Sequence, residues 1–284
     1  MAASPEVLRF SAFTDTPAGG NPAGVVLEAR GMTEAAMLAL AAEVGYSETA
    51  FVTPRAGGRE YDARYFSAEA EVPFCGHATI ATAVALAERD GTGDIVFHIA
   101  AGPVPIHTGR DEAGAIVASL TSVAPEIFEV EPADLEAALR LLGWSPAEID
   151  AALPPRIAYA GARHLILAAG SRQRLADLDY DYDRLKALML RLDLTTVDLV
   201  WREREDTFHA RNPFPVGGVV EDPATGAAAA AFGAYLRELG LVRPPAKVTI
   251  LQGHDMGRPS RLTVGIPNDR AEISVSGRAL RIGP

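Results

Sequence analysis

Cys75–Leu86 reads CGHATIATAVAL, and it carries more information about the architecture than any other stretch of the chain. The residues that follow the histidine are small or apolar on every side of a helix. A helix that is apolar all round is usually buried, and small side chains let a sheet wrap closely around it. We therefore expect a buried helix over residues 78–89, enclosed by strands.

The second half of the chain holds a similar stretch, Asp222–Ala231, which reads DPATGAAAAA. It also follows a strand and a turn, predicts an alanine-rich helix over residues 225–239, and precedes further strands. Internal repeats of this kind have to be considered before a fold is assigned. The repeat places Cys75 and Asp222 at the same point of two similar units.

Strands and helices alternate irregularly along the rest of the chain. A helix capped by Thr33 is expected to run to Val44 and stop at Gly45. Two further helices are expected over residues 132–142 and 182–192. Alternating apolar and polar residues predict strands over residues 7–14, 25–27, 49–53, 61–66, 94–99, 104–108, 116–120, 157–160, 165–168, 197–202, 207–210, 248–251, 262–265, 271–275 and 279–282.

These elements predict an α+β protein of two pseudo-symmetric domains. Each domain is expected to have a curved, mostly antiparallel sheet or barrel around one central apolar helix. The expected domains are residues 1–125 and residues 126–284, and the last strand could return to the first domain.

Composition excludes several functional classes. The chain has 284 residues, a net charge of −11 and 48% hydrophobic residues, which is ample for a buried core. It has no basic stripe for nucleic acid, no apolar run long enough to span a membrane, and no signal-peptide pattern at its start, so we expect a cytoplasmic protein. The single cysteine, Cys75, excludes an internal disulfide and a cysteine-rich zinc cluster.

The start of the first predicted helix is a candidate anion site. Free backbone N–H groups and the helix dipole favour anions there, and Gly76 permits close backbone approach. Cys75 and His77 are two residues apart, and helix residues at that spacing do not face each other. We therefore expect a buried, inert cysteine rather than a Cys75–His77 pair, and a lone core histidine is the alternative for His77.

The start of the second predicted helix has a similar character. Asp222 and the proline after it suit a helix N-terminus, with Thr225 as a capping residue. An anion site formed by Gly226 and Ala227, beside the Asp222 carboxylate, is the functional interpretation. Two such helix starts facing each other would hold a small carboxylic acid.

Glu48 is the third candidate, at the head of an apolar strand. A carboxylate in an enclosed cleft suits proton transfer, although a surface acid is the alternative. Four arginines could each bind a carboxylate or form ordinary salt bridges: Arg64, Arg163, Arg211 and Arg258. No nucleotide-binding loop or metal-ligand spacing is evident.

Together these segments resemble the PhzF-like family, the phenazine-biosynthesis isomerase group within the diaminopimelate-epimerase fold. The matching pieces occur in family order over nearly the whole chain: Phe13 with Gly20–Val26, Ser47–Val52, Arg64–Phe66, Cys75–Thr79, Glu221–Gly226, Gln252-Gly253 and Gly257–Ser260. The resemblance implies two pseudo-symmetric domains with an active site in the cleft between them, a homodimer, and no cofactor.

The resemblance also implies roles for particular residues. The family glutamate falls on Glu48 as general acid/base, and His77 and Asp222 line the cleft. Related epimerases use two cysteines, one per domain, so a two-thiol mechanism is excluded here. Phenazine enzymes of the family commonly carry serine where this chain has Ala227.

The sequence therefore predicts a cofactor-independent isomerase that moves a proton on a small cyclic or amino-substituted carboxylic acid. Glu48, His77 and Asp222 are the predicted catalytic residues. The predicted substrate-binding residues are Cys75, Gly76, Thr225, Gly226 and Ala227. A cofactor-independent epimerase and a non-catalytic protein that binds small acids or protein partners are the alternatives.

Overall fold

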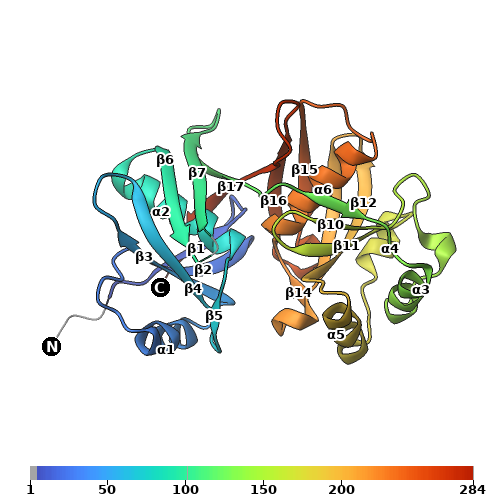
Figure 1. The fold of residues 1–284 in the computed structure, drawn as a ribbon, viewed down its shortest axis with the longest axis horizontal. Helices are drawn as coiled ribbons and strands as arrows, with labels where there is room; N and C mark the ends of the chain where they lie inside the picture. The colour runs from blue at the N-terminus through green and yellow to red at the C-terminus, as the bar shows by residue number, and fades with distance from the viewer. Residues whose placement is uncertain (1–4, 101, 284) are drawn as a thin grey trace. The chain divides into compact units, whose positions relative to one another are not determined.

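A computed structural model describes residues 5–100 and 102–283, which divide into two compact units. The first unit consists of Met1–Thr121 together with Ser276–Pro284, and the second of Ser122–Val275. Helices and strands mix in both units (Figure 1), so the α+β class predicted from the sequence is confirmed. None of the helices in the described part of the chain is both long and apolar enough to cross a membrane.

The described residues of the first unit form a closed barrel of eight strands. Pairing runs β1–β2–β3–β4–β6–β7–β8–β17 and returns from β17 to β1. The pairs β2–β3 and β4–β6 are parallel, and a helix lies in the connection within each pair, as parallel neighbours require. The strands are β1 Leu8–Ala12, β2 Asn21–Val26, β3 Glu48–Pro54, β4 Glu60–Phe66, β5 Glu71–Val72, β6 Gly93–Ile99, β7 Gly102–Arg110, β8 Ile116–Thr121 and β17 Ser274–Arg281.

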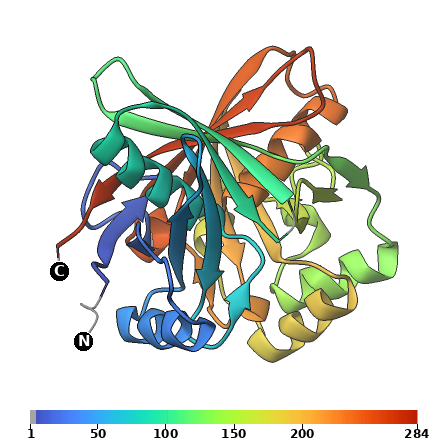
Figure 2. The ribbon, with the colours of Figure 1, turned by 60° about the vertical axis from the view of Figure 1, so that its left-hand side comes forward.

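Helix α2, Gly76–Asp90, occupies the barrel interior and is buried from His77 to Ala87. It contacts β1, β2, β3, β7 and β8, and Figure 2 shows the strands of this unit around it. An eight-stranded barrel has little internal room, so only a helix of small side chains fits. The Thr79 and Thr82 hydroxyls donate to the carbonyls of Cys75 and Ala78, which satisfies these buried polar groups.

Helix α1, Glu34–Val44, lies outside this barrel. The Thr33 side chain accepts a hydrogen bond from the Ala36 amide, and Gly45 ends the helix in a left-handed conformation. Both boundaries confirm the sequence prediction. The buried residues Met37 and Ala41 pack in a cluster with side chains of β2, β3 and β4.

The second unit repeats the order of elements seen in the first. The pair β10–β11 is antiparallel, β11–β12 is parallel, β12–β13 is antiparallel and β13–β15 is parallel, which matches β1–β2, β2–β3, β3–β4 and β4–β6. Its strands are β9 Glu126–Phe128, β10 Arg156–Tyr159, β11 Arg163–Ala168, β12 Thr196–Arg204, β13 Thr207–Pro213, β14 Glu221–Asp222, β15 Ala246–Gln252 and β16 Ser260–Ile266.

Helix α6, Gly226–Glu238, is the counterpart of α2 and contacts β9, β10, β11 and β16. A Cβ added at Gly233 would lie 2.6 Å from Val264 Cγ1 and 3.1 Å from Ile273 Cγ2. The helix therefore packs against its surroundings without room for a methyl group at this point.

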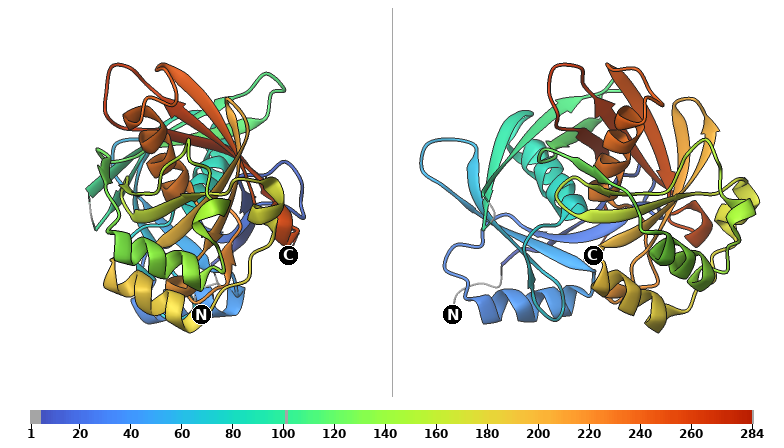
Figure 3. Two further views of the ribbon diagram at one scale, coloured as in Figure 1. Left: turned by 90° about the vertical axis from the view of Figure 1, so that its right-hand side faces the viewer. Right: turned by 45° about the vertical axis from the view of Figure 1, so that its right-hand side comes forward.

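The other helices of the second unit form a second apolar core with the strands. Helices α3 and α5 contact each other, and Figure 3 shows them side by side. The cluster includes Leu139 from α3, Leu185 from α5 and Leu165 from β11. The remaining bounds are α3 Pro132–Leu141, α4 Arg172–Ala176, α5 Tyr182–Arg191, and three short 3₁₀ turns at Pro146–Glu148, Pro215–Gly217 and His254–Met256.

The end of the chain differs from the sequence prediction. Strands over residues 271–275 and 279–282 are expected, but one continuous strand, β17, runs from Ser274 to Arg281. A Cβ at Gly277 would lie 2.3 Å from Phe13 Cδ1. This glycine makes room for an aromatic ring and does not mark a turn.

Candidate active-site clusters

The repeat has a different register from the one the sequence suggests. Cys75 is the N-cap of α2 and Thr225 is the N-cap of α6, so Cys75 corresponds to Thr225, 150 positions later. The preceding strands β5 and β14 begin at Glu71 and Glu221, with the same separation. Asp222 therefore corresponds to Val72, and the prediction that Asp222 and Cys75 are equivalent is wrong. At a separation of 150 residues the two segments share Glu, Pro, Gly and Ala, as EVPFCGHA and EDPATGAA.

The first unit brings three chain segments together at one end of its barrel. Asn21 begins β2, Glu48 begins β3, and Cys75 and His77 belong to the start of α2. Because β2 and β3 are parallel, their first residues lie at the same edge of the sheet. The cluster thus contains Glu48, Cys75 and His77, which the sequence predicts, together with Asn21 and Ser47.

His77 is the centre of this cluster and is buried. Its Nε2 lies 3.4 Å from Glu48 Oε2 and 3.4 Å from Ser47 Oγ. Its Nδ1 lies 3.2 Å from Asn21 Nδ2 and 3.3 Å from Cys75 Sγ. Ser47 is exposed, and the Glu48 carboxylate is partly accessible, with 17% of its side chain exposed.

The Asn21 contact fixes the tautomer of His77. An amide nitrogen only donates hydrogen bonds, so Nδ1 of His77 accepts from Asn21 Nδ2 and carries no proton. The neutral ring then carries its proton on Nε2, which faces Glu48. The Nε2–Oε2 contact is long for a hydrogen bond, and contacts of this kind often tighten when a substrate binds.

Cys75 and His77 are close together, which corrects the expectation that they point apart. That expectation applied helix spacing to both residues. Cys75 precedes the first helical residue and has an extended backbone, with φ −143° and ψ 112°. Its side chain therefore folds back over the first turn, and its sulfur lies 3.3 Å from the imidazole.

Thr79, inside the barrel, holds the carbonyl of Cys75 in place. This carbonyl accepts hydrogen bonds from the amide and the hydroxyl of Thr79. Because the Thr79 hydroxyl hydrogen is used there, the Tyr65 hydroxyl donates to Thr79 Oγ1, at 2.7 Å. Burial raises the pKa of Tyr65, so this phenol keeps its proton and continues to donate.

The second unit holds the other predicted residues around Asp222. The Thr225 hydroxyl donates to Asp222 Oδ2 at 2.6 Å. Gln252 is buried, accepts from the Thr225 amide, and donates to the Asp222 carbonyl and to Thr225 Oγ1. Gln252 thus fixes the segment that carries the carboxylate. It belongs to a matching motif in the sequence, but the periodicity of β15 gives it no functional signal.

Neither central helix has a side-chain N-cap. No cap hydrogen bond is formed by the Cys75 thiol or the Thr225 hydroxyl. The first N–H groups of a helix have no intrahelical acceptor, so the amides near Gly76 and Gly226 can receive an anion. Ala227 occupies the position that corresponds to His77, 150 residues later, and the second unit therefore has no imidazole at its helix start.

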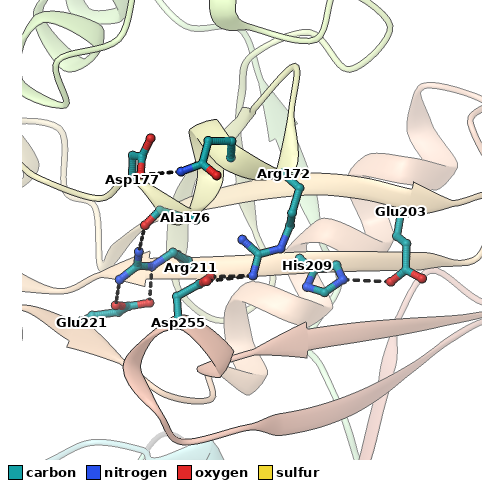
Figure 4. Close-up of polar contacts among 9 residues, drawn as sticks. Arg172, Ala176, Asp177, Glu203, His209, Arg211, Glu221 and Asp255 are labelled. Carbon is teal, nitrogen blue, oxygen red and sulfur yellow. Dashed lines mark hydrogen bonds and ion pairs between the residues drawn. The ribbon is translucent and has the colours of Figure 1, made fainter.

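Arg211 and Arg64 hold the short strands that precede α6 and α2, and they do so in the same way. Arg211 in β13 forms a bidentate pair with Glu221, at 2.9 and 2.5 Å, and also donates to the Ala176 carbonyl (Figure 4). Arg64 in β4 forms the equivalent bidentate pair with Glu71, which lowers the pKa of that carboxyl. Both arginines form salt bridges within the chain, buried for Arg211 and exposed for Arg64, which confirms the ordinary salt-bridge alternative for both.

A chain of buried hydrogen bonds begins at Asn212, the strand partner of Asp222. The Asn212 backbone pairs with Asp222 across β13 and β14, and the Asn212 amide donates to Asp198 Oδ1 at 3.0 Å. The Thr196 hydroxyl donates to Asn212 Oδ1, so Nδ1–H of His164 donates to Thr196. Burial raises the pKa of Asp198 to about 7 and lowers the pKa of His164 to about 3.

Strand pairing shows which residue replaces Glu48 in the second unit. Phe51 pairs with Arg64, and Leu199 pairs with Arg211. Three residues before Phe51 is Glu48, and three residues before Leu199 is Thr196. The counterpart of the candidate base is therefore a buried hydroxyl inside the hydrogen-bond chain.

Comparison with known proteins places these clusters in context. The model of the PhzC-PhzF family, described as phenazine biosynthesis-like protein, matches residues 10–282. An uncharacterized isomerase of Mesorhizobium japonicum is 33% identical over 97% of this chain and 94% of its own. The trans-2,3-dihydro-3-hydroxyanthranilate isomerase of Pseudomonas fluorescens is 31% identical over 96% of each chain. A solved PhzF-family phenazine biosynthesis protein of Bacillus anthracis superposes with a TM-score of 0.88, at 26% identity over 98% of this chain and 96% of its own.

Proposed function

Because the chain belongs to the PhzC-PhzF family of phenazine biosynthesis-like proteins, we propose that it is an isomerase acting on a small carboxylic acid by general acid/base catalysis. The substrate class is a cyclic or amino-substituted acid with a conjugated system. Glu48 is the proposed acid/base, and the reaction needs only groups of the protein itself.

The observation that carries this proposal is the Glu48–His77 contact of 3.4 Å in a largely buried setting. Glu48 takes a proton from a carbon of the substrate, and the electron pair of the broken C–H bond enters the conjugated system. The protonated Glu48 then returns the proton to another carbon. Nε2–H of His77 faces the carboxylate and orients it, and general acid/base transfer contributes about 10²- to 10⁴-fold to the rate.

The carboxylate of the substrate is proposed to bind at the helix starts. The amides near Gly76 and Gly226 offer donors, and neither N-cap side chain occupies them with a cap hydrogen bond. The helix dipole adds a favourable interaction with an anion. Asp222 would contact an amino or hydroxyl substituent through its carboxylate, which the Thr225 hydroxyl holds in place at 2.6 Å.

Epimerisation is the alternative to be tested, and it would need Asp222 as the second base beside Glu48 or Cys75, because the other candidate pairs are unsuitable. Inverting a carbon needs two bases on opposite faces of one atom, each about 3–3.5 Å from it, so the bases lie roughly 6–7 Å apart. Ligand atoms of Glu48 and Cys75 lie within 4.8 Å of each other, which is too close. At the equivalent positions of the second unit stand Thr196 and Thr225, whose hydroxyls are poor bases.

The test is proton NMR of the purified protein in D₂O with a panel of small cyclic acids. The panel includes trans-2,3-dihydro-3-hydroxyanthranilate, for which the Pseudomonas fluorescens relative is named. We expect one acid to isomerise, with deuterium at the new C–H position to the extent that the proton on partly exposed Glu48 exchanges with solvent before its return. Glu48→Gln should reduce this turnover by at least about 100-fold.

A matched control is Glu60→Gln, which changes another glutamate that contacts a histidine, His98, at 2.7 Å. This pair is on the outside of the barrel, and turnover should be unchanged. Full turnover by Glu48→Gln would refute the assignment of the base. Inversion of a stereocentre without proton relocation would establish the epimerase, and saturable binding without isomerisation or exchange would establish a non-catalytic acid-binding protein. The expected homodimer stays a prediction that light scattering can measure.

A further inference from the structure

Among residues 5–100 and 102–283, one group of three His, Cys or carboxylate ligand atoms lies within 4.8 Å, and it consists of Glu48, Cys75 and His77. It offers a sulfur, an imidazole nitrogen and a carboxylate oxygen. This donor set is typical of Zn²⁺ sites, and three protein ligands with a fourth open position are typical of accessible ones. The sequence predicts no metal site because its ligands come from two segments without a recognisable spacing.

The two donor distances from His77 Nε2 suit one tetrahedral ion, and the Glu48 and Cys75 ligand atoms lie within 4.8 Å of each other. With bonds of about 2.0–2.3 Å, tetrahedral ligand atoms lie roughly 3.3–3.7 Å apart. His77 Nε2 lies 3.4 Å from Glu48 Oε2 and 3.7 Å from Cys75 Sγ. The sulfur is also 3.3 Å from Nδ1, so it lies beside the ring, and a rotation about the Cα–Cβ bond of Cys75 would turn it toward an ion at Nε2.

The surroundings of His77 support a ligand role for Nε2. A metal-bound histidine usually has a hydrogen-bond partner at its other nitrogen, and Asn21 contacts Nδ1 at 3.2 Å. In the structure the Asn21 amide donates to Nδ1, so an ion at Nε2 requires this amide to turn until its oxygen accepts from Nδ1–H. The partial exposure of Glu48 leaves a path from solvent to the cluster.

We propose that Glu48, Cys75 and His77 form a binding site for a soft divalent cation, with Zn²⁺ as the best-matched ion. On binding, the Cys75 thiol releases its proton to solvent and the thiolate, Nε2 and the carboxylate become ligands. Thiolate and imidazole ligands favour Zn²⁺ over Mg²⁺ or Ca²⁺. If Glu48 is the base under the proposed function, the bound ion occupies that base and acts as a competitive inhibitor of the isomerase.

The first test uses the full-length protein and Co²⁺ as a spectroscopic probe in place of Zn²⁺. A thiolate ligand to Co²⁺ gives a charge-transfer band in the near ultraviolet. Cys75 is the single cysteine of the chain, so such a band can come only from this site. We expect the band to appear with Co²⁺ and to disappear when Zn²⁺ is added. Absence of the band in the wild-type protein would overturn the proposal.

The second test measures Zn²⁺ affinity by calorimetry, with a phosphine reductant that keeps the thiol reduced. Cys75→Ser should weaken binding at least about tenfold, and His77→Asn should do the same. His107→Asn is the matched control, because His107 contacts Asp94 at 2.7 Å on the exposed surface. Equal Zn²⁺ affinity in the wild type and in folded Cys75→Ser, or the same loss in His107→Asn, would show adventitious surface binding and refute the site.

Neither readout depends on turnover, so the two proposals fail separately. A cobalt–thiolate band in a protein that turns over no acid would leave the cation site standing and would count against the isomerase. Turnover that Zn²⁺ does not inhibit, in a protein without the band, would support the isomerase and refute the cation site. Within a working isomerase, Zn²⁺ should raise KM for the acid and leave kcat unchanged.

Discussion

Cys75 and Thr225 hold the same position in the two halves of the molecule, as the N-caps of α2 and α6. Each follows a short strand that begins with a glutamate bound to an arginine of the neighbouring strand. The equivalence shows where the halves have diverged. The first keeps a sulfur, an imidazole and an accessible acid at its helix start, and the second keeps a hydroxyl hydrogen-bonded to Asp222.

The first prediction concerns the tautomer of His77. Asn21→Asp places a carboxylate beside Nδ1, which favours a proton on that nitrogen and removes the proton from Nε2. Turnover should fall about 10- to 100-fold, and ¹⁵N NMR of the imidazole should show the proton at Nδ1. A loss of turnover with the proton still on Nε2 would mean that Asn21 acts in another way.

The second prediction concerns Gln252. Its side-chain amide makes three hydrogen bonds within the Asp222–Thr225 segment. Gln252→Ala removes these three partly buried hydrogen bonds, which costs about 1–3 kcal/mol of unfolding free energy, and turnover should fall with it. Gln173→Ala is the control, because Gln173 makes a side-chain bond to Asp177 on the exposed surface, and urea unfolding should show little change there. Equal losses for both variants would contradict the prediction.

The third prediction concerns the buried chain of Asp198 and His164. Burial raises the pKa of Asp198 from 3.8 to about 7, so its contribution to stability is lost as the pH rises through this window. Burial lowers the pKa of His164 from 6.5 to about 3, so its contribution is lost as the pH falls through that window. The two effects oppose each other between pH 4 and pH 6.5.

Replacing one of the two titrating groups should therefore reveal the pH dependence that the other group gives to the free energy of unfolding. The free energy of unfolding of Asp198→Asn, relative to wild type, should rise by about 1.4 kcal/mol per pH unit across that range. His164→Gln should show the opposite slope. Urea titrations at several pH values measure both, and parallel curves for wild type and both variants would show that neither group titrates in this way.

The fourth prediction concerns the packing of α6. Gly233→Ala forces a methyl group to within 2.6 Å of Val264 Cγ1 and should cost about 1–3 kcal/mol of stability. Adding Val264→Ala makes room for the methyl group, so the double variant should lose less than the sum of the single variants. Stability losses that simply add in the double variant would show that the Val264 side chain is not the source of the strain.

The sequence predicts the central helices well because their composition is unusual. Alanine on every face of a helix has few explanations other than burial in a confined space, and α2 and α6 are buried as expected. The cap at Thr33 and the stop at Gly45 follow from local chemistry. The two-residue strands β5 and β14 were not predicted, since so short a segment has no periodicity to detect.

The sites were harder to predict because they depend on contacts between distant segments. Asn21 and His77 are 56 residues apart and meet at 3.2 Å, which no local pattern reveals. The single strand β17 was predicted as two, because the local sequence does not show that Gly277 lies against Phe13. The prediction that Cys75 faces away from His77 failed because helix spacing does not apply before the first helical residue.

Strand β17 pairs with β1 and β8, and this has a consequence for how the protein is made. A ribosome synthesises the whole second unit between β8 and β17. The first half of the nascent chain therefore emerges with β1 and β8 each lacking a pairing partner. Its barrel can close only after β17 has been synthesised. The unit that is translated second can complete its own core first. A nascent chain or fragment that stops before Ser274 leaves unpaired strand edges, which are sites of aggregation.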